Sequence, residues 1–259
     1  MCWAGLVAAL LAAGCEPSVI EGTVADVKGD VLPGVGVGAV GDTRQVVTDA
    51  RGRYALPFEP GALQLVFIKT GYTPGRLDLV VEGARTVQAT TVVLWPLPTG
   101  KGVHLFEDFR YRQLVEVTSQ SYEMAGGDLV QGVKVTPDLV TQTETPMLLC
   151  FKMPHYDVRF CRLRQVAVPS PESPDPAYAQ EVWASEDTLP ALLEPIDEPE
   201  GSLVEMRLEA PLTPGVYAVH WGALDTHAPT DPRAYLFRVA EPGSEEAAAN
   251  SDNAAPLAE

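Results

Sequence analysis

Residues 19–97 consist of short runs rich in Val, Thr, Leu and Tyr, separated by glycine and proline turns. The whole chain of 259 residues contains 22 Gly and 23 Pro, and few stretches show the 3.6-residue apolar period of a helix. Such punctuation predicts an all-β architecture built from small β-sandwich domains. Three fragments define the first domain: Gly22-Thr23-Val24, Leu32-Pro33-Gly34-Val35 and Thr48-Asp49-Ala50-Arg51-Gly52-Arg53-Tyr54.

The stretch after the second fragment alternates apolar residues with glycine. Val35, Val37 and Ala39 predict a strand with one apolar face and one nearly bare face. Residues 36–41 also match the glycine-rich dinucleotide fingerprint, which requires a helix N-terminus directly after it. A β-like run and a tight turn at residues 49–52 follow instead. We therefore expect a strand and no dinucleotide site.

The three fragments, the turn Pro60-Gly61 and the pair Gly71-Tyr72 occur in an order and spacing that resemble the carboxypeptidase regulatory-like domain. This family is a transthyretin-like β-sandwich common in exported bacterial proteins. The resemblance covers residues 19–97 and implies a fold more than an activity, because the domain is an accessory one in most proteins that carry it.

The N-terminus predicts export. Residues 6–13 form an apolar run of signal-peptide length, too short to span a bilayer. Residues 11–15 resemble the bacterial lipoprotein cleavage box, so residues 1–14 would be the signal peptide, Cys15 the lipidated residue and residues 15–18 a tether. Glu16 after the cysteine points, by the same resemblance, to the outer membrane. The segment lacks Lys and Arg, which leaves an ordinary secretory signal open.

The second half predicts another sandwich. We expect a linker at residues 98–102, an immunoglobulin-like β-sandwich at residues 103–240 and a disordered acidic tail at residues 241–259. A hairpin is expected between Met147 and Val168, with Cys150 and Cys161 placed symmetrically about a turn at residues 154–157. Facing positions on paired strands would suit a disulfide between these two cysteines.

Charge limits the partners. The formal net charge is -17 with scattered Lys and Arg, so a nucleic acid would be repelled. We expect no nucleic-acid partner, a membrane contact only through the lipid at Cys15, and a cell-envelope protein or glycan as the ligand.

Few residue patterns predict chemistry. His104 and Glu107 have the His-x-x-Glu spacing of zinc carboxypeptidases, but alternation along a strand would place them on opposite faces. His220, Asp225 and His227 lie in a stretch similar to the last hairpin of periplasmic copper-resistance proteins, which makes them weak candidates for a copper site.

No Gly-x-Ser-x-Gly element is present, and the carboxylates are dispersed, so no catalytic residue and no cofactor can be named. The sequence favours a non-catalytic, membrane-anchored binding or scaffolding module in the cell envelope. A periplasmic copper protein and an unrecognised hydrolase stay open as alternatives. A continuous exposed apolar patch on either sandwich would favour the interaction module.

Overall fold

The computed structural model describes residues 18–83, 86–170, 176–196, 202–225 and 231–241. The chain divides between Trp95 and Pro96 into two compact units, called here the N-terminal unit and the C-terminal unit. Strands dominate both, and the one helix among the described residues is the short η1 (Pro176–Tyr178). None of the described helical residues forms a segment long and apolar enough to cross a membrane.

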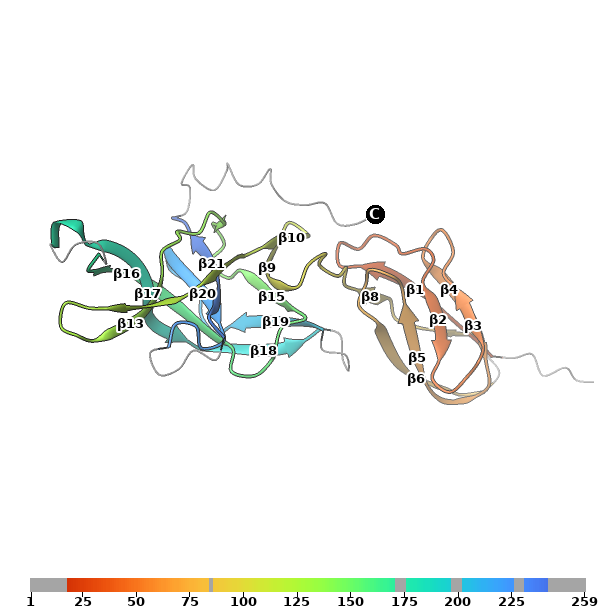
Figure 1. Ribbon diagram of the computed structural model, residues 1–259. Helices are drawn as coiled ribbons and strands as arrows, with labels where there is room; N and C mark the ends of the chain where they lie inside the picture. The colour runs from red at the N-terminus through yellow and green to blue at the C-terminus, as the bar shows by residue number, and fades with distance from the viewer. Residues whose placement is uncertain (1–17, 84–85, 171–175, 197–201, 226–230, 242–259) are drawn as a thin grey trace, which may run out of the picture. The chain divides into compact units, whose positions relative to one another are not determined.

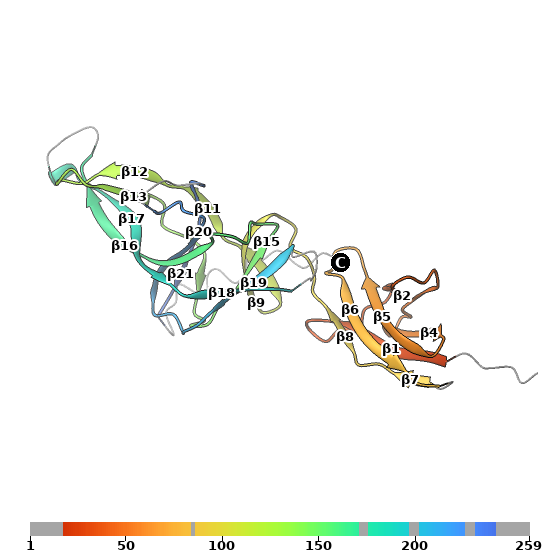
Figure 2. The same ribbon diagram turned by 90° about the horizontal axis from the view of Figure 1, so that it is seen from below.

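The N-terminal unit is a sandwich of two sheets, visible as two layers in Figures 1 and 2. In one sheet the order is β4-β1-β7, and β8 also pairs with β1. In the other the order is β3-β2-β5-β6. The strands are β1 (Ser18–Asp26), β2 (Gly36–Ala39), β3 (Gln45–Val47), β4 (Arg53–Phe58), β5 (Gly61–Ile68), β6 (Gly75–Val81), β7 (Thr86–Gln88) and β8 (Val92–Leu94).

Alternation along these strands fills the core between the two sheets. Val37 and Ala39 of β2 point inward, as the sequence pattern predicts, and β4 alternates between exposed and buried residues in the same way. The expected strand is thus confirmed over Gly36–Ala39, and it leads into a turn instead of a helix. Fully enclosed side chains include Ile20, Leu56, Leu65, Phe67 and Leu94.

The C-terminal unit is a second sandwich, built from a five-stranded sheet of order β10-β9-β15-β19-β18 and an eight-stranded sheet. The eight-stranded sheet has the order β11-β21-β20-β16-β17-β13-β12, and β14 pairs with β21. The strands are β9 (Gly102–Glu107), β10 (Arg110–Gln113), β11 (Val115–Thr118), β12 (Gln120–Glu123), β13 (Leu129–Val133), β14 (Val140–Thr141), β15 (Met147–Phe151), β16 (Arg159–Val168), β17 (Gln180–Leu189), β18 (Ala191–Pro195), β19 (Leu203–Leu208), β20 (Gly215–His220) and β21 (Arg233–Val239).

This topology is immunoglobulin-like. Strands β9, β15, β19 and β18 occupy the A, B, E and D positions of one sheet, while β16, β20 and β21 occupy the C, F and G positions of the other. The short β14 runs parallel to β21, as an A′ strand does beside strand G. At the start of β20 the Tyr217 hydroxyl donates a 2.6 Å hydrogen bond to the carbonyl of Thr213, which forms a tyrosine corner. The predicted fold class is confirmed for both units.

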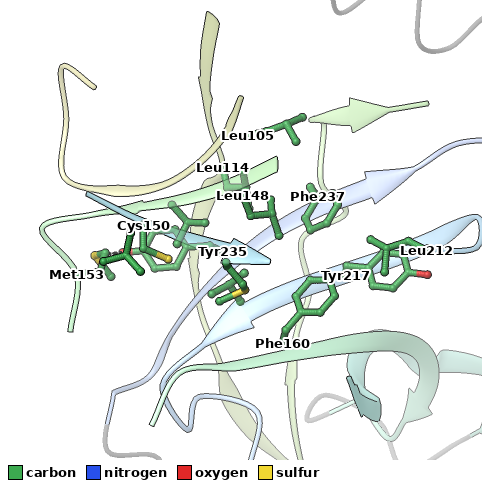
Figure 3. Close-up of a cluster of buried hydrophobic side chains, with 14 of the residues drawn as sticks. Leu105, Leu114, Leu148, Cys150, Met153, Phe160, Leu212, Tyr217, Tyr235 and Phe237 are labelled. Carbon is green, nitrogen blue, oxygen red and sulfur yellow. Dashed lines mark hydrogen bonds between the residues drawn. The ribbon is translucent and has the colours of Figure 1, made fainter. Parts of the chain in front are cut away.

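The core of the C-terminal unit centres on three stacked rings, shown in Figure 3. Phe160 and Tyr217 have ring centroids 5.7 Å apart, and Phe237 lies 5.7 Å from Tyr217 and 6.2 Å from Phe160. Leu148 and Cys150 of β15 enter the same cluster from the opposite sheet. The cluster therefore joins the two sheets.

The predicted hairpin between Met147 and Val168 is wrong. Strand β15 pairs with β9 and β19, whereas β16 pairs with β17 and β20 in the other sheet, so the chain crosses the core between them. Cys150 and Cys161 are both free and buried, and the predicted disulfide is not formed. Cys150 lies in the core between the sheets, and Cys161 belongs to a cluster on the other face of its own sheet. Burial raises the pKa of each thiol to about 12.

Candidate protein-binding face

The glycines of the recognised fragments fill structural roles in the N-terminal unit. Gly22 faces Tyr54 across β1 and β4, and a Cβ at Gly22 would lie 2.6 Å from the Tyr54 hydroxyl oxygen. Gly52 has φ +68°, and a Cβ there would lie 2.6 Å from the carbonyl oxygen of Val24. Both positions therefore require glycine, the second on conformational grounds as well.

Polar side chains of these fragments form hydrogen bonds with backbone groups of the same unit. The Thr48 hydroxyl donates to the Leu32 carbonyl at 2.7 Å and accepts from the Val35 N–H at 2.9 Å, which fixes the Leu-Pro-Gly-Val turn. Asp49 accepts the N–H groups of Arg53 and Arg51, and the contacts with Arg53 hold the pKa of this carboxyl below its usual range. Both side chains therefore have a structural role in the turns of the unit.

The outward side of the sheet β3-β2-β5-β6 has a different character. Because Val37 and Ala39 point inward, Gly36 and Gly38 point outward. The other outward positions follow from the strand register, and we call the whole set the outer face. Besides the two glycines it contains Gln45 and Val47 of β3, Ala62, Gln64, Val66 and Ile68 of β5, and Arg76, Asp78 and Val80 of β6.

Large aliphatic side chains on and beside the outer face are open to solvent. Val47 is 66% exposed, Ile68 64% and Val80 68%, and Val40, directly after β2, is 63% exposed. An antiparallel sheet of a soluble domain normally carries polar residues on its solvent side. Aliphatic residues at these positions mark the outer face as a candidate interaction surface.

The two glycines form a trough in the outer face. Gly36 lies between Val47 and Ile68 on the neighbouring strands, and Gly38 lies between Gln45 and Val66. Glycine inside a strand destabilises it by roughly 0.5–1 kcal/mol relative to alanine. Such positions often mark a place where a ligand or another backbone approaches closely.

The charged residues of the outer face neutralise one another. Arg76 donates to the Gln64 side-chain carbonyl at 3.2 Å, and the Gln64 amide donates to the Asp78 carboxylate at 2.9 Å. This ladder crosses β5 and β6 beside a hollow of about 460 Å³ at the Ala62 and Val80 end of the two strands. The face thus presents aliphatic surface with no net charge.

The predicted copper ligands are not brought together as a described site. His220 is 1% exposed and its Nδ1 accepts a hydrogen bond from the Gly222 N–H at 3.1 Å. Burial lowers the pKa of His220 to about 4, so the ring is neutral at pH 7. Asp225 forms an ion pair with Arg159 at 2.7 Å. His227 and the predicted lipidation site Cys15 lie outside the described residues, within which no group of three metal-ligating side chains gathers.

His104 and Glu107 are also held by other groups. The Nε2 atom of His104 lies 2.8 Å from the Gly100 carbonyl oxygen, and burial lowers the pKa of this histidine. Glu107 lines a hollow of about 520 Å³, where its carboxylate accepts from Arg112 and Thr143, each at 3.0 Å, and from Thr141. The Glu107 carboxylate is thus held by neighbouring side chains of the hollow.

Sequence reasoning identified the bare side of β2 but not the outer face. The sequence signal for the part of the outer face on β5 was the apolar character of both faces of residues 61–68. Leu65 and Phe67 point inward there, while Val66 and Ile68 point outward. Placing β3 and β5 on either side of β2 requires the strand register, which the sequence pattern does not supply.

Several solved structures share a limited likeness with the chain. A streptococcal ancillary pilin is 15% identical with a TM-score of 0.24, and the match covers 87% of this chain and 59% of the pilin. A candidate carbohydrate-binding protein of Bacteroides uniformis is 9% identical with a TM-score of 0.26, over 85% of this chain and 95% of that one. The major pilin subunit of Bacillus cereus is 9% identical with a TM-score of 0.28, over 86% and 69%. Such scores do not establish a common fold.

No curated protein matches the sequence. The model of the carboxypeptidase regulatory-like domain family matches residues 19–94, which covers every strand of the N-terminal unit from β1 to β8. The match agrees with the sandwich fold and with the structural roles of Gly22, Thr48, Asp49, Gly52 and Tyr54. Residues 19–94 are therefore a carboxypeptidase regulatory-like domain.

Proposed function

We propose that this protein is a non-catalytic binding module of the bacterial cell envelope and that its outer face holds a protein partner. The observation that carries the proposal is the set of exposed aliphatic side chains Val47 of β3, Ile68 of β5 and Val40 directly after β2, which border the outward glycines of β2. A continuous apolar patch of this kind is typical of an interaction site.

A protein fits this surface better than a glycan does. The outer face combines glycine, aliphatic and mutually paired polar residues, and it includes no aromatic ring. Small-molecule sites usually combine a concave apolar lining with a few convergent polar groups. Here Arg76, Gln64 and Asp78 are paired with one another in a row. An aliphatic surface of another protein would bury these side chains without leaving a charge unpaired.

The charge distribution also supports a protein partner. Residues 18–95 contain seven Lys and Arg against eight Asp and Glu, a net charge of -1, whereas the whole chain carries -17. The acidic excess therefore lies almost entirely outside the N-terminal unit. Electrostatic repulsion at the outer face is correspondingly small.

Attachment to the membrane is part of the proposal. The small residues before Cys15 support lipidation of this cysteine, and Glu16 supports the outer membrane as the destination. The acyl chains would hold the protein by burying CH₂ groups at about 0.8 kcal/mol each. The two folded units then need no membrane-binding surface of their own.

The test is purification from native membranes through an affinity tag after Glu259, comparing the wild type with Cys15→Ser and with Ile68→Glu. Val93→Glu is the matched control, because Val93 is 50% exposed on β8 of the other sheet. We expect Cys15→Ser to leave the membrane fraction. Ile68→Glu should stay there but lose a stoichiometric protein that the wild type and Val93→Glu retain.

Two results would overturn this proposal. If Cys15→Ser fractionates with the membrane as the wild type does, lipidation at Cys15 is not the anchor. If Ile68→Glu retains the same protein as Val93→Glu, the outer face is not the binding surface.

A further inference from the structure

The trough in the outer face is not required by the fold of a single molecule. A Cβ added at Gly36 would meet only the Ile68 carbonyl oxygen, at 3.6 Å, which is an ordinary contact. A Cβ at Gly38 would meet Cγ of the exposed Gln45 side chain at 3.2 Å and the Arg44 carbonyl oxygen at 3.4 Å, so only a small shift of these neighbours would be needed. Neither glycine has a positive φ.

At other strand glycines of the same unit, a neighbouring side chain of the unit occupies the space that a Cβ would need. A Cβ at Gly22 would lie 2.6 Å from the Tyr54 hydroxyl oxygen, and one at Gly75 would lie 2.6 Å from Cδ2 of Leu94. No side chain lies within 4 Å of a Cβ added at Gly36, and the side chain nearest to a Cβ at Gly38 is that of the exposed Gln45, at 3.2 Å. Because strand glycines lower stability, two bare ones on an exposed face indicate that something outside the unit comes close there.

We infer that the occupant of this trough is the outer face of a second copy of the chain. This inference rests on the proposed function of the outer face as a protein-binding surface. In the pair that we infer, the outer faces of two copies lie against each other, and a twofold axis runs between the two sheets. The axis is parallel to the strands and lies above the line midway between β2 and β5. It therefore places β5 of one copy over β2 of the other. The trough at Gly36 and Gly38 of each copy then faces Val66 and Ile68 of the other copy.

The register makes this pairing self-complementary. Gly36 is level with Ile68, and Gly38 is level with Val66, so the twofold axis sets each of these β5 side chains above the corresponding glycine of the second copy. Sheets that pack face to face lie about 10 Å apart. A Val or Ile side chain that opposes a glycine fits this spacing without meeting another side chain head-on.

The polar positions also match across the axis. The axis places β3 of one copy over β6 of the other. Gln45 and Arg76 belong to the same row across the sheet, through Gly38 and Val66, so Gln45 faces Arg76 of the second copy. A side-chain amide oxygen can accept a hydrogen bond from a guanidinium group. In the row through Gly38 and Val66 no polar residue then faces an aliphatic one.

The expected association is weak in solution. Four strands spaced about 4.8 Å apart and about 20 Å long present roughly 400 Å² per copy. A total of roughly 800 Å² is below the size of a standard stable interface. We expect a dissociation constant on the order of 100 µM for the free protein. Copies anchored in the same membrane would pair more readily, because anchoring raises their effective concentration.

Sedimentation equilibrium of the full chain carrying Cys15→Ser tests this inference, at concentrations up to about 1 mM so that the expected constant is bracketed. In that background, Gly36→Leu should weaken dimerisation at least about tenfold while leaving the thermal unfolding temperature within a few degrees, since the monomer has room for the side chain. Val93→Leu, on the other sheet, should leave the dissociation constant unchanged.

A pair of charge variants gives a second, directional readout. Gln45→Glu should tighten the dimer by about threefold and Gln45→Lys should weaken it, because both would face Arg76 of the second copy. Within one copy Gln45 and Arg76 are separated by two strands, so folding stability should change little.

The two proposals fail in different ways. A chain that stays monomeric at every concentration, or dimers insensitive to Gly36→Leu, would overturn the second copy as the occupant. The binding function of the outer face would survive that result if Ile68→Glu still lost a protein from native membranes. If both experiments gave no effect, the outer face would not be an interaction surface.

Discussion

Replacing Thr48 with valine tests the structural role of the family fragments. Valine has nearly the same shape as threonine but lacks the hydroxyl that donates to the Leu32 carbonyl and accepts from the Val35 N–H. Both hydrogen bonds are buried, and Thr48 is 5% exposed. Each buried backbone group left without a partner costs about 1–3 kcal/mol. We expect Thr48→Val to lower the free energy of unfolding of the N-terminal unit by about 2–6 kcal/mol.

The assay is urea unfolding of the full chain followed by circular dichroism, with Thr48→Ser as the control. Serine keeps the hydroxyl and removes one methyl group, so it should cost about 1 kcal/mol. Two units can unfold in separate transitions, and the one that shifts in the variant identifies the N-terminal unit. If the valine and serine variants differed by less than about 0.5 kcal/mol, the hydroxyl would not be fixing the turn.

Three further outcomes follow from buried groups. Gly22→Ala should lower the thermal unfolding temperature by several degrees, because its Cβ would collide with Tyr54; an unchanged temperature in a thermal melt would contradict the contact. The pKa of His220 is about 4 in the fold against 6.5 for the free side chain, so the unfolded state takes up the proton first. The free energy of unfolding should therefore fall by about 3 kcal/mol from pH 6.5 to pH 4, and urea titrations should show a smaller fall in His220→Gln. Cys150 and Cys161 should resist alkylation until the protein unfolds, as followed by peptide mass mapping, and labelling of the native protein would contradict their burial.

The N-terminal unit could be predicted from sequence because its informative residues act locally. Gly52 needs a positive φ, and Asp49 bonds to backbone groups two and four residues ahead of it. Turn chemistry of this kind leaves a clear signature in the sequence. The order of such signatures specifies the strands between them, which is why the family resemblance and the fold agree.

The hairpin prediction failed because the C-terminal unit depends on contacts between distant residues. Cys150 and Cys161 are symmetric about the turn at residues 154–157, so their spacing suits a hairpin as well as it suits a crossing between sheets. The choice between a hairpin and a crossing depends on the strand partners. Leu149 pairs with Glu205 and Phe160 pairs with Val219, more than fifty residues away in each case. Strand β15 is buried on both faces, and periodicity alone cannot choose the neighbours of such a strand.

The outer face could be predicted from the sequence only in part. The alternation of glycine with valine predicts a bare surface on β2, and the structure confirms that Gly36 and Gly38 point away from the core. The aliphatic borders of that surface come from β3 and β5, and only the register places Val47 and Ile68 on either side of Gly36. A surface that four strands share cannot be predicted from the residue pattern of one strand.

The glycines of the N-terminal unit fall into two groups. Those of one group are required by the fold, and those of the other are not. Gly22 and Gly52 would place a Cβ within 2.6 Å of other atoms, so their identity follows from the fold and says nothing about activity. Gly36 and Gly38 meet no such obstacle, yet each forgoes the stability that alanine would add. The family fragments quoted from the sequence include the first pair and omit the second. In this chain the outward glycines, and not those of the family fragments, are therefore the positions at which to test for a partner.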